Sequence, residues 1–312
     1  MKGSFKEEVM KYRALIGLII FSIIISLLTD RFMTVSNILN VLRQTSINAI
    51  IAGGMTYVIL TSGIDLSVGS VFAFTGAIGA YLIASDTNVF LTILIVLFLG
   101  LLIGGFNGVV ISKGKVQPFI ATLATMTLAR GATLVFTQGK PISTGASENA
   151  EAFAKIGSGY LFSIPIPIYI MVIVFALAYY ILKHTRLGRY IYALGGNEEA
   201  TSLSGINVSK VKILVYMFSG VLAALAGLIL TSRLSSAQPT AGSGYELDAI
   251  AAVVLGGTSL SGGYGNVLST IIGALIIGIL NNSLNLMNVS SYYQLMIKGL
   301  VILIAVLLDR KH

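Results

Sequence analysis

The chain is poor in residues that catalyse reactions or bind metals. It contains no cysteine, and its two histidines, His184 and His312, lie far apart in charged segments. Gly139-Lys140-Pro141 comes nearest to a phosphate-binding loop, but it lacks the upstream glycine and the following Ser or Thr that such a loop needs. We therefore expect no catalytic residues, no metal site and no cofactor bound by the chain itself.

Uncharged polar residues within apolar runs are the stronger signal of function. Amides and hydroxyls suit a neutral polyol, because they donate and accept hydrogen bonds without carrying a charge. The other interpretation of each residue is a hydrogen bond between neighbouring helices. Three of the amides lie on adjacent faces of one predicted helix. The candidate residues of a substrate pathway are Asn48, Tyr57, Thr61, Asn107, Asn281, Asn282 and Asn285.

Three ionisable residues at predicted membrane depth have both a functional and a structural interpretation. Asp65 begins an apolar run, where it could gate a pathway or relay protons, or could cap the backbone N–H groups of a helix. Arg130 and Lys298 lie well inside apolar runs, where a charge costs about 2.5–3.5 kcal/mol. We expect each either to reach the interface with its charged end or to pair with an acidic group, for which Glu246 and Asp248 are available.

These residues require a membrane scaffold to position them. Of the 312 residues, 55% are hydrophobic and 10% are charged, whereas soluble domains carry about 25% charged residues. The net charge of +8 comes from basic residues in short loops between apolar runs, which indicates membrane topology rather than nucleic-acid binding. We predict one all-α, polytopic transmembrane domain over residues 1–312, embedded in a lipid bilayer.

About ten apolar runs are long enough to cross a bilayer, at about 20 residues each. The even number puts both ends of the chain on one side, and the basic amino terminus indicates the cytoplasm. The first run has no cleavage pattern behind it and is predicted to be retained. The predicted spans lie near 14–29, 46–62, 66–84, 89–111, 117–137, 166–182, 213–231, 248–260, 267–285 and 292–308.

The second and eighth runs are short and interrupted by glycines. Each is followed by a similar turn, at 63–69 and at 257–263. Matching interrupted segments in two halves indicate an internal repeat, and often a substrate pathway. Four residues of these turns are candidate structural or gating positions, and Ser259 would cap a helix in the second turn if Asp65 does so in the first: Asp65, Gly69, Gly257 and Ser259.

Small residues recur on one face of two predicted helices. Gly100, Gly104 and Gly108 are spaced four residues apart, and so are Gly220 and Ala224. Small side chains at this spacing let helix backbones approach closely in a membrane. We interpret the pattern as packing within one subunit, with a dimer interface as the alternative.

A polar stretch at 195–206 separates two long apolar runs. Basic residues flank it on both sides, at 183–189 and at 210–212, which predicts a cytoplasmic loop of about 183–212. Little other polar chain is predicted on that side, so we expect a soluble partner to act on this stretch. The longer outer loop at 138–165 is either a docking surface for an extracytoplasmic partner or a tether.

Three long stretches of the chain resemble the ribose permeases of bacterial ATP-binding-cassette importers. The resemblance covers nearly the whole chain after the first span. It is carried by residues 59–69, 187–198 and 233–260, which include Ser62-Gly63-Ile64-Asp65-Leu66-Ser67, Leu194-Gly195-Gly196-Asn197-Glu198 and Gly256-Gly257-Thr258-Ser259-Leu260.

The resemblance implies a fold like that of the vitamin B12 importer and a location in the bacterial plasma (inner) membrane. Two permease copies would form the channel, a partner ATPase would bind ATP and Mg²⁺, and a soluble extracytoplasmic protein would deliver the sugar. Related permeases carry other monosaccharides, so the resemblance indicates ribose or a close relative. The coupling segment that enters the ATPase would comprise Gly195, Gly196, Asn197, Glu198, Glu199, Ala200, Thr201 and Gly205.

A secondary transporter driven by an ion gradient is the alternative function. Such a transporter needs a carboxylate at membrane depth, and Asp65 is the candidate. A membrane enzyme is a third class, but the sequence offers no catalytic set for it.

Overall fold

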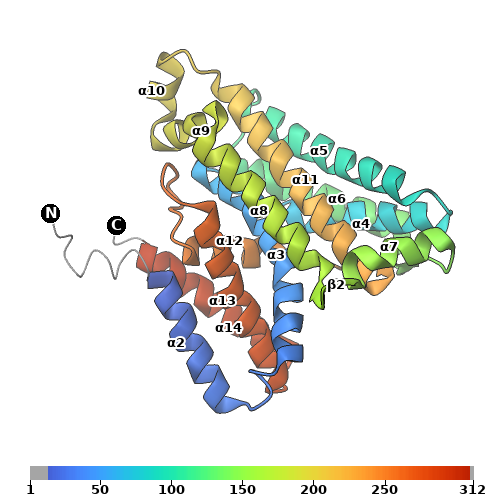
Figure 1. Ribbon diagram of the computed structural model, residues 1–312. Coiled ribbons are helices and arrows are strands. Elements are labelled where there is room, and N and C mark those ends of the chain that lie inside the picture. Colours follow the sequence, from blue (N-terminus) through green and yellow to red (C-terminus); the bar gives the residue numbers. More distant parts are fainter. Residues whose placement is uncertain (1–12, 310–312) are drawn as a thin grey trace.

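The computed structural model describes residues 13–309 and is built mainly of helices (Figure 1). The basic residues that indicate a cytoplasmic amino terminus include Lys2, Lys6 and Lys11. These three residues, and residues 310–312, lie outside the part of the chain that the structure describes. Helices follow all ten predicted apolar runs. They are α2 (Arg13–Leu28), α3 (Val35–Leu60), α4 (Val68–Ala84), α5 (Val89–Ser112), α6 (Pro118–Thr137), α8 (Ile166–His184), α11 (Val208–Leu234), α12 (Tyr245–Leu255), α13 (Val267–Leu286) and α14 (Ser291–Asp309).

Shorter elements lie in the loops between these helices. Helix α7 (Glu148–Ser158) occupies the outer loop, and α9 (Arg186–Gly196) and α10 (Glu198–Leu203) occupy the polar stretch. Two-residue strands pair antiparallel as β1 (Ile142–Ser143) with β4 (Ser236–Ala237), and β2 (Tyr160–Leu161) with β3 (Ile164–Pro165). These short strand pairs connect loop segments by hydrogen bonds, and the architecture of the protein is helical.

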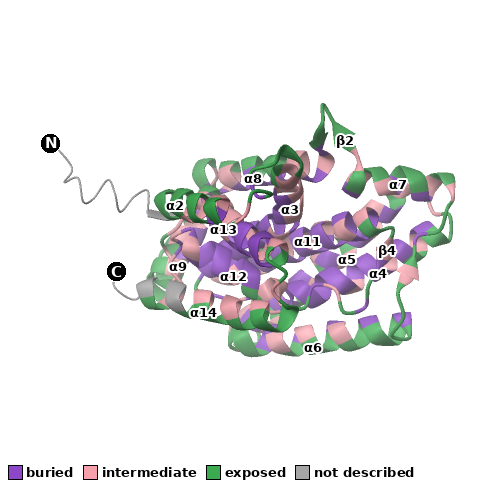
Figure 2. Ribbon diagram, turned by 90° about the horizontal axis from the view of Figure 1, so that it is seen from below, coloured by how far each residue is buried: buried purple, intermediate pink, exposed green. Residues whose placement is uncertain are grey.

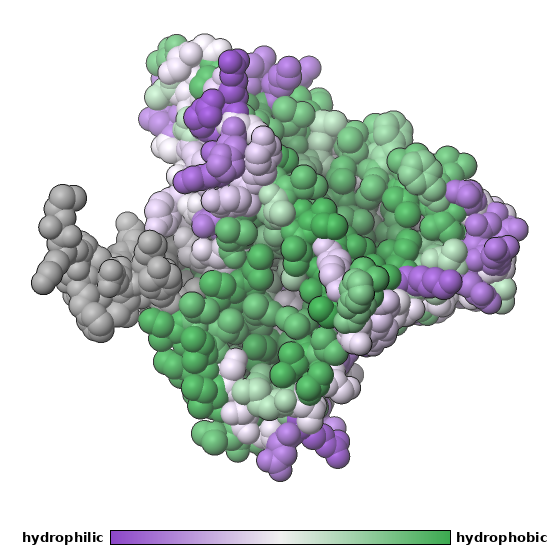
Figure 3. Space-filling view, viewed as in Figure 1, coloured by the Kyte–Doolittle hydropathy of each residue, from purple (hydrophilic) through white to green (hydrophobic). Residues whose placement is uncertain are grey.

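Five helices, α5, α6, α8, α11 and α13, are long and apolar enough to cross a membrane. Hydrophobic side chains cover the middle of the molecule as a broad belt, and hydrophilic side chains gather beyond it at α9 and α10 and at the α7 end (Figure 3). Because apolar surface facing outward would be unfavourable in water, this distribution is the one expected of a protein surrounded by lipid.

The second predicted span is not short, and the prediction of an interruption there was wrong. Helix α3 runs for 26 residues and passes through Gly53-Gly54 without a break. A side chain at Gly54 would come within 3.0 Å of the Ser219 backbone on α11, so this glycine permits close packing of two helices.

The eighth span is shorter than predicted. Helix α12 has 11 residues and ends at Leu255. At 1.5 Å per residue, such a helix covers only about half of the roughly 30 Å hydrocarbon core of a bilayer. The polypeptide therefore turns back at Gly256-Gly257, where Gly257 takes a positive φ of 87°.

Helix α11 forms the centre of the bundle and packs against α3, α4 and α5, whereas α2, α6 and α14 expose most of their outer faces (Figure 2). The small-residue faces meet here. A side chain at Gly100 or Gly104 on α5 would collide with the backbone carbonyls of Gly220 or Tyr216 on α11. The pattern therefore serves packing within one chain, as we interpreted it.

Candidate functional site

The polar stretch forms two helices that project from one end of the bundle (Figure 1). Gly195 and Gly196 are the last residues of α9, and Asn197 caps α10 by accepting a hydrogen bond from the Ala200 N–H at 2.8 Å. Glu198 and Glu199 follow at the amino end of α10, where negative charge stabilises a helix. Every residue type in this segment therefore supports a short, well-defined helix.

The outer face of α10 is free to meet another protein. Leu203 is 84% exposed, so a large apolar side chain lies on the outer face of α10. The buried Thr201 donates to the Asn197 carbonyl at 2.7 Å, and Glu198 pairs with Lys212 of α11 at 2.7 Å. Gly205, with a φ of 81°, turns the chain back towards α11. A rigid helix that presents an exposed leucine is suited to enter a groove on a partner.

Three segments of the chain, each containing or next to a glycine, meet at the carboxyl end of α9. The Gly263 N–H donates to the Leu60 carbonyl at 3.0 Å, and the Ser62 hydroxyl donates to the Ser261 carbonyl at 2.8 Å. Ser62 also donates to the Gly195 carbonyl at 3.3 Å. We refer to this contact between residues 60–62, 195–196 and 261–263 as the glycine junction.

The glycine junction joins the projecting helices to both turns that follow α3 and α12. A Cβ at Gly195 would collide with the Leu60 carbonyl, so this close approach is possible only without a side chain. Gly196, the next residue, has open space around its Cα. A displacement of α9 would therefore act directly on the turns at the ends of α3 and α12.

Asp65 belongs to a fully hydrogen-bonded network in the turn between α3 and α4. Its Oδ1 accepts from the Ser67 N–H at 3.0 Å and from the Ser67 hydroxyl at 2.6 Å, and its Oδ2 accepts from the Ser219 hydroxyl at 2.9 Å. Asn107 donates to Ser67 and accepts from Thr125. The carboxylate thus organises the start of α4 and links it to α5, α6 and α11.

Ser259 does not repeat this role, and the expectation that it caps a helix was wrong. Its hydroxyl accepts from the Ser261 N–H at 3.2 Å inside the loop 256–266, and the next helix begins only at Val267. Gly69 lies against a distant segment instead of forming a bend, since a side chain there would collide with the Gly242 carbonyl. The two turns thus differ in structure despite their similar sequences.

Arg130 stabilises a loop that would otherwise leave carbonyl groups unpaired at membrane depth. Its guanidinium donates to the carbonyls of Pro239 and Ala241, both at 2.9 Å. The expected ion pair with Glu246 or Asp248 does not form at Arg130, because the backbone of this loop takes its hydrogen bonds. Lys298 does pair with Asp248, at 2.9 Å.

The predicted pathway residues do not converge on one cavity. Several are engaged within the protein: Tyr57 donates to the Ala178 carbonyl at 2.6 Å, Thr61 donates to the Val58 carbonyl, and the buried Asn107 is hydrogen-bonded at both ends of its amide. Asn282 exchanges two hydrogen bonds with Asn37 across α3 and α13, at 3.0 and 2.9 Å.

The remaining three amides lie on α3 and α13 and are less fully engaged. Asn285 is exposed and accepts from Gln294 at 2.9 Å. The amide oxygens of Asn48 and Asn281 are buried without a hydrogen-bond partner among the described residues. Since α3 and α13 pack against each other, this helix pair carries the polar groups that remain available to a ligand.

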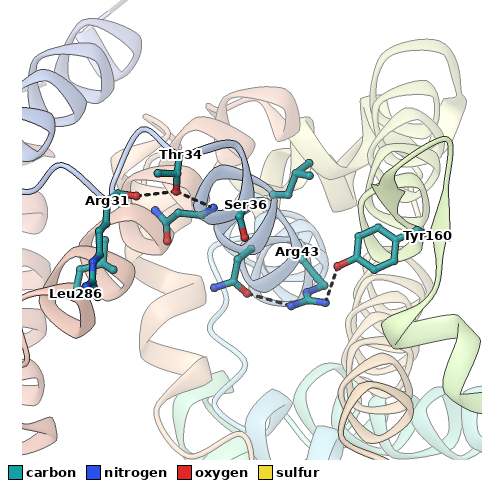
Figure 4. A pocket seen from close by; sticks show the side chains of 9 residues that line it. Arg31, Thr34, Ser36, Arg43, Tyr160 and Leu286 are labelled. Atoms are coloured by element: carbon teal, nitrogen blue, oxygen red, sulfur yellow. Dashed lines mark hydrogen bonds between the residues drawn. The ribbon is translucent and has the colours of Figure 1, made fainter.

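A pocket of about 370 Å³ opens near the first turns of α3 (Figure 4). Arg43 reaches from α3 towards the Tyr160 hydroxyl, at 3.4 Å, and donates to the Asn40 amide at 3.2 Å. Arg31 and Ser36 also line the pocket. The Nε of Arg43 is buried, and no described residue accepts its hydrogen bond.

The sequence interpretation missed Arg43 because the second span was predicted to begin at 46, whereas α3 begins at Val35. The available signal was helical spacing. Asn37, Asn40 and Gln44 recur every three or four residues ahead of the apolar run, which is typical of the polar face of a helix.

Helix α7 covers the end of the bundle at which α11 ends. Ala150 and Phe153 are buried against α11 and its neighbours, and the Gly157 N–H donates to the Ser232 hydroxyl at 2.8 Å. Asn149 donates to the Asp86 carboxylate at 3.0 Å. Hydrogen bonds from Asn149 and from Ser147 hold the pKa of the Asp86 carboxyl below its ordinary value. Ala150, Phe153 and Gly157 therefore fix α7 to the bundle, whereas most residues of the loop at 138–165 are exposed.

A protein family described as "Branched-chain amino acid transport system / permease component" matches residues 37–306. The matched range contains α10, the glycine junction, the Asp65 network and both intramembrane basic residues. The chain belongs to this permease family.

The curated relatives of this permease are named as sugar permeases. It is 65% identical over 297 residues to the ribose import permease protein RbsC of Haemophilus influenzae, covering 95% of this chain and 92% of that one. It is 56% identical to the ribose import permease protein RbsC of Bacillus subtilis, over 98% and 95% of the two chains. The D-allose transport system permease protein AlsC of Escherichia coli is 40% identical, over 94% and 89%.

No solved structure matches this permease. The relatives are transport subunits rather than enzymes, and this chain is a transport subunit of the same kind. Its apolar helices and its family make it a multi-pass protein of the inner membrane.

Proposed function

We propose that this chain is the membrane-spanning permease subunit of an ATP-driven importer that carries ribose, or a closely related monosaccharide, into the bacterial cytoplasm. The observation that carries the proposal is identity of 56% and 65% over nearly the full chain to relatives named as ribose import permeases. Identity to the D-allose relative is lower, at 40%. The branched-chain amino acids in the family description receive no comparable support, because no carboxylate within residues 13–309 lines the pocket at Arg43 to pair with the ammonium group of an amino acid.

In this proposal, α10 is the segment that receives force from a separate ATPase. ATP and Mg²⁺ bind to that partner, and this chain binds no cofactor of its own. The exposed Leu203 and the helix cap at Asn197 support a docked helix. Movement of α10 passes through α9 to Gly195, and from there to Leu60 and Gly263 in the glycine junction.

The proposed arrangement has ten membrane segments, of which α12 is a half-span, and both termini in the cytoplasm. This places α9, α10 and the glycine junction on the cytoplasmic side, where the flanking basic residues belong. It places α7 and the pocket at Arg43 on the outer side. We infer a fold of the vitamin B12 importer class and a homodimer in which two copies enclose the pathway.

The sugar is delivered from outside by a soluble binding protein and passes along polar groups of the permease. The pocket at Arg43 offers donors from Asn40 and Tyr160 that match the oxygen atoms of a polyol. Further in, Asn48 and Asn281 supply amide oxygens without protein partners. ATP binding opens the pathway outward, and hydrolysis resets it.

An ion-gradient mechanism receives less support from the contacts of Asp65. A coupling carboxylate must exchange partners as it binds and releases its ion. Both oxygens of Asp65 accept hydrogen bonds from Ser67 and Ser219, and the side chain is only 1% exposed. These contacts favour a structural role for the carboxylate.

Uptake of labelled ribose by cells that lack their own ribose permease tests the proposal. The cells should regain uptake when this chain is expressed with its ATPase and binding protein. Ribose should compete best, D-allose and D-xylose more weakly, and leucine not at all. Uptake of labelled leucine by these cells, with no uptake of labelled ribose, would assign the chain to amino-acid transport.

A further inference from the structure

A second pocket, of about 580 Å³, lies where α5 ends and α11 begins. Its polar side is formed by Lys113, Lys210, Asn207 and Ser209, and its apolar side by Ile213 and Leu214. None of these residues belongs to α10, to the glycine junction or to the proposed sugar pathway.

The two lysines are cationic and lack acidic partners. Both are exposed, and neither forms an ion pair within residues 13–309, whereas Lys212 nearby is paired with Glu198. The Ser112 hydroxyl, next to Lys113, is buried and finds no hydrogen-bond partner there. This end of the groove therefore offers positive charge to an anion.

Apolar side chains continue from Lys210 towards the middle of α11. Ile213 lies one turn beyond Ser209, and Leu214, which is 39% exposed, lies one turn beyond Lys210. The face of α5 that contacts α11 carries Gly104 and Gly108, so Phe106 and Val109 point away from the groove and its apolar wall comes from α11. One helical turn is about 5 Å, so the charge of Lys210 lies next to this apolar wall.

The two helices cannot close this groove. A Cβ at Gly108 would lie 2.6 Å from the Ile213 Cα, so the backbones are already in contact just inside it. Beyond that contact, α5 ends at Ser112 and α11 starts at Val208, which leaves the lysine-lined opening between them.

We propose that this groove binds one anionic phospholipid, with its phosphate between Lys113 and Lys210 and an acyl chain along Ile213 and Leu214. A groove with lysine ammonium groups at its opening and apolar side chains further in matches a phospholipid better than a soluble protein. Basic pockets between membrane helices at the cytoplasmic leaflet bind anionic headgroups of this kind. The bound lipid would stabilise the amino end of α11. This end lies one helical turn from Lys212, whose ion pair with Glu198 connects α11 to α10, so the lipid would also affect the position of α10. The leaflet assignment rests on the proposed orientation, but the binding itself does not.

Native mass spectrometry of the full chain tests this site, after purification from nanodiscs that contain phosphatidylcholine with or without phosphatidylglycerol. The wild-type chain should retain one phosphatidylglycerol in preference to phosphatidylcholine. K113Q/K210Q should lose that preference, by about fivefold for each lysine, as expected of about 1 kcal/mol per basic residue. K113R/K210R should keep it.

Lys115→Gln is the matched control, because Lys115 is exposed in the same loop but does not line the groove. It should retain phosphatidylglycerol as the wild type does. Equal loss in K115Q would overturn the proposal by showing general surface attraction. Unchanged retention in K113Q/K210Q would also overturn it. Loss of ATPase association by K113Q/K210Q in pure phosphatidylcholine would assign the groove to the ATPase instead.

Discussion

Asp248 on α12 and Lys298 on α14 form an ion pair with an Nζ–Oδ2 distance of 2.9 Å, and the carboxylate side chain is only 3% exposed. The pair anchors a helix too short to cross the membrane alone. In the loop just before α12, the carbonyls of Pro239 and Ala241 accept hydrogen bonds from the Arg130 guanidinium. Charged side chains at membrane depth here hold the short helix α12 and the loop before it in position.

Replacing Asp248 with Asn should destabilise the permease by about 3 kcal/mol, because removing one partner of a buried pair leaves an uncompensated charge. Thermal unfolding of the purified chain in detergent measures the effect. The double variant D248N/K298Q should recover part of the loss, and E199Q, at an exposed residue without an ion pair, should have no effect. A D248N variant as stable as the wild type would show that the pair contributes nothing.

Replacing Gly195 with Ala should reduce ATP-driven uptake by at least about tenfold, which corresponds to about 1.4 kcal/mol. The new methyl group would collide with the Leu60 carbonyl and open the glycine junction. Gly196→Ala is the matched control, since it adds the same group to the same helix in open space. Both variants should still bind the ATPase through α10. Equal uptake by G195A and G196A would exclude the junction as the route of coupling.

Replacing Arg130 with Leu should loosen the loop at 235–244. Hydrogen bonds to a charged donor contribute about 1.5–3 kcal/mol each, and this variant leaves the two carbonyls without them. Hydrogen exchange of that loop should rise in R130L and rise less in R130K, which keeps one donor group. Protection that is unchanged in R130L would contradict the role assigned to the guanidinium.

The contact between Asp86 and Asn149 should depend on pH in a defined direction. Hydrogen bonds from Asn149 and Ser147 lower the pKa of Asp86 in the folded protein. A lowered folded pKa contributes stability above the ordinary value of about 3.9, and that contribution is lost as pH falls through the folded pKa.

Exchange protection at the start of α7 should therefore persist to a lower pH in the wild type than in N149A, which raises the pKa of Asp86 towards its ordinary value. Hydrogen exchange across acidic pH measures this difference. Identical pH profiles for the two proteins would show that Asn149 does not stabilise the carboxylate.

Replacing Arg43 with Gln should reduce ribose uptake several-fold if the pocket at Tyr160 receives the sugar. Binding of the sugar-free binding protein, measured separately on the same complex, should stay unchanged. Loss of that binding together with uptake would assign the pocket to protein docking. Arg189, which belongs to α9 and not to the pocket, provides R189Q as a control for loss of a surface charge.

The sequence predicts the helices well where apolar runs end at polar residues. The ends of α4, α5 and α6 agree within two residues of prediction, since each run is bounded by charged or turn-forming residues. Helix α3 begins eleven residues early because Asn37, Asn40 and Arg43 are polar yet helical. Asn37 is held by the Thr34 cap and by Asn282, which lies 245 residues away in sequence, and Asn40 accepts a hydrogen bond from Arg43.

Site residues are harder to predict because polarity does not reveal partners. Asn107 and Asn281 look alike in sequence, but Asn107 is enclosed by Ser67 and Thr125, and Asn281 retains a free amide oxygen. Likewise, Gly195 and Gly196 are adjacent and identical, and only the approach of Leu60 distinguishes them. The charge pattern indicated the polar segment at 195–206 as the proposed coupling segment, but the contacts that join it to both turns depend on the tertiary structure.

Ribose uptake into proteoliposomes with ATP inside tests the central claim most directly. The permease should transport ribose only when its ATPase and its binding protein are both present, and removal of either should reduce uptake to the level of empty liposomes. Uptake by the permease alone, driven by an imposed proton or sodium gradient, would contradict the account and would make Asp65 the residue to examine.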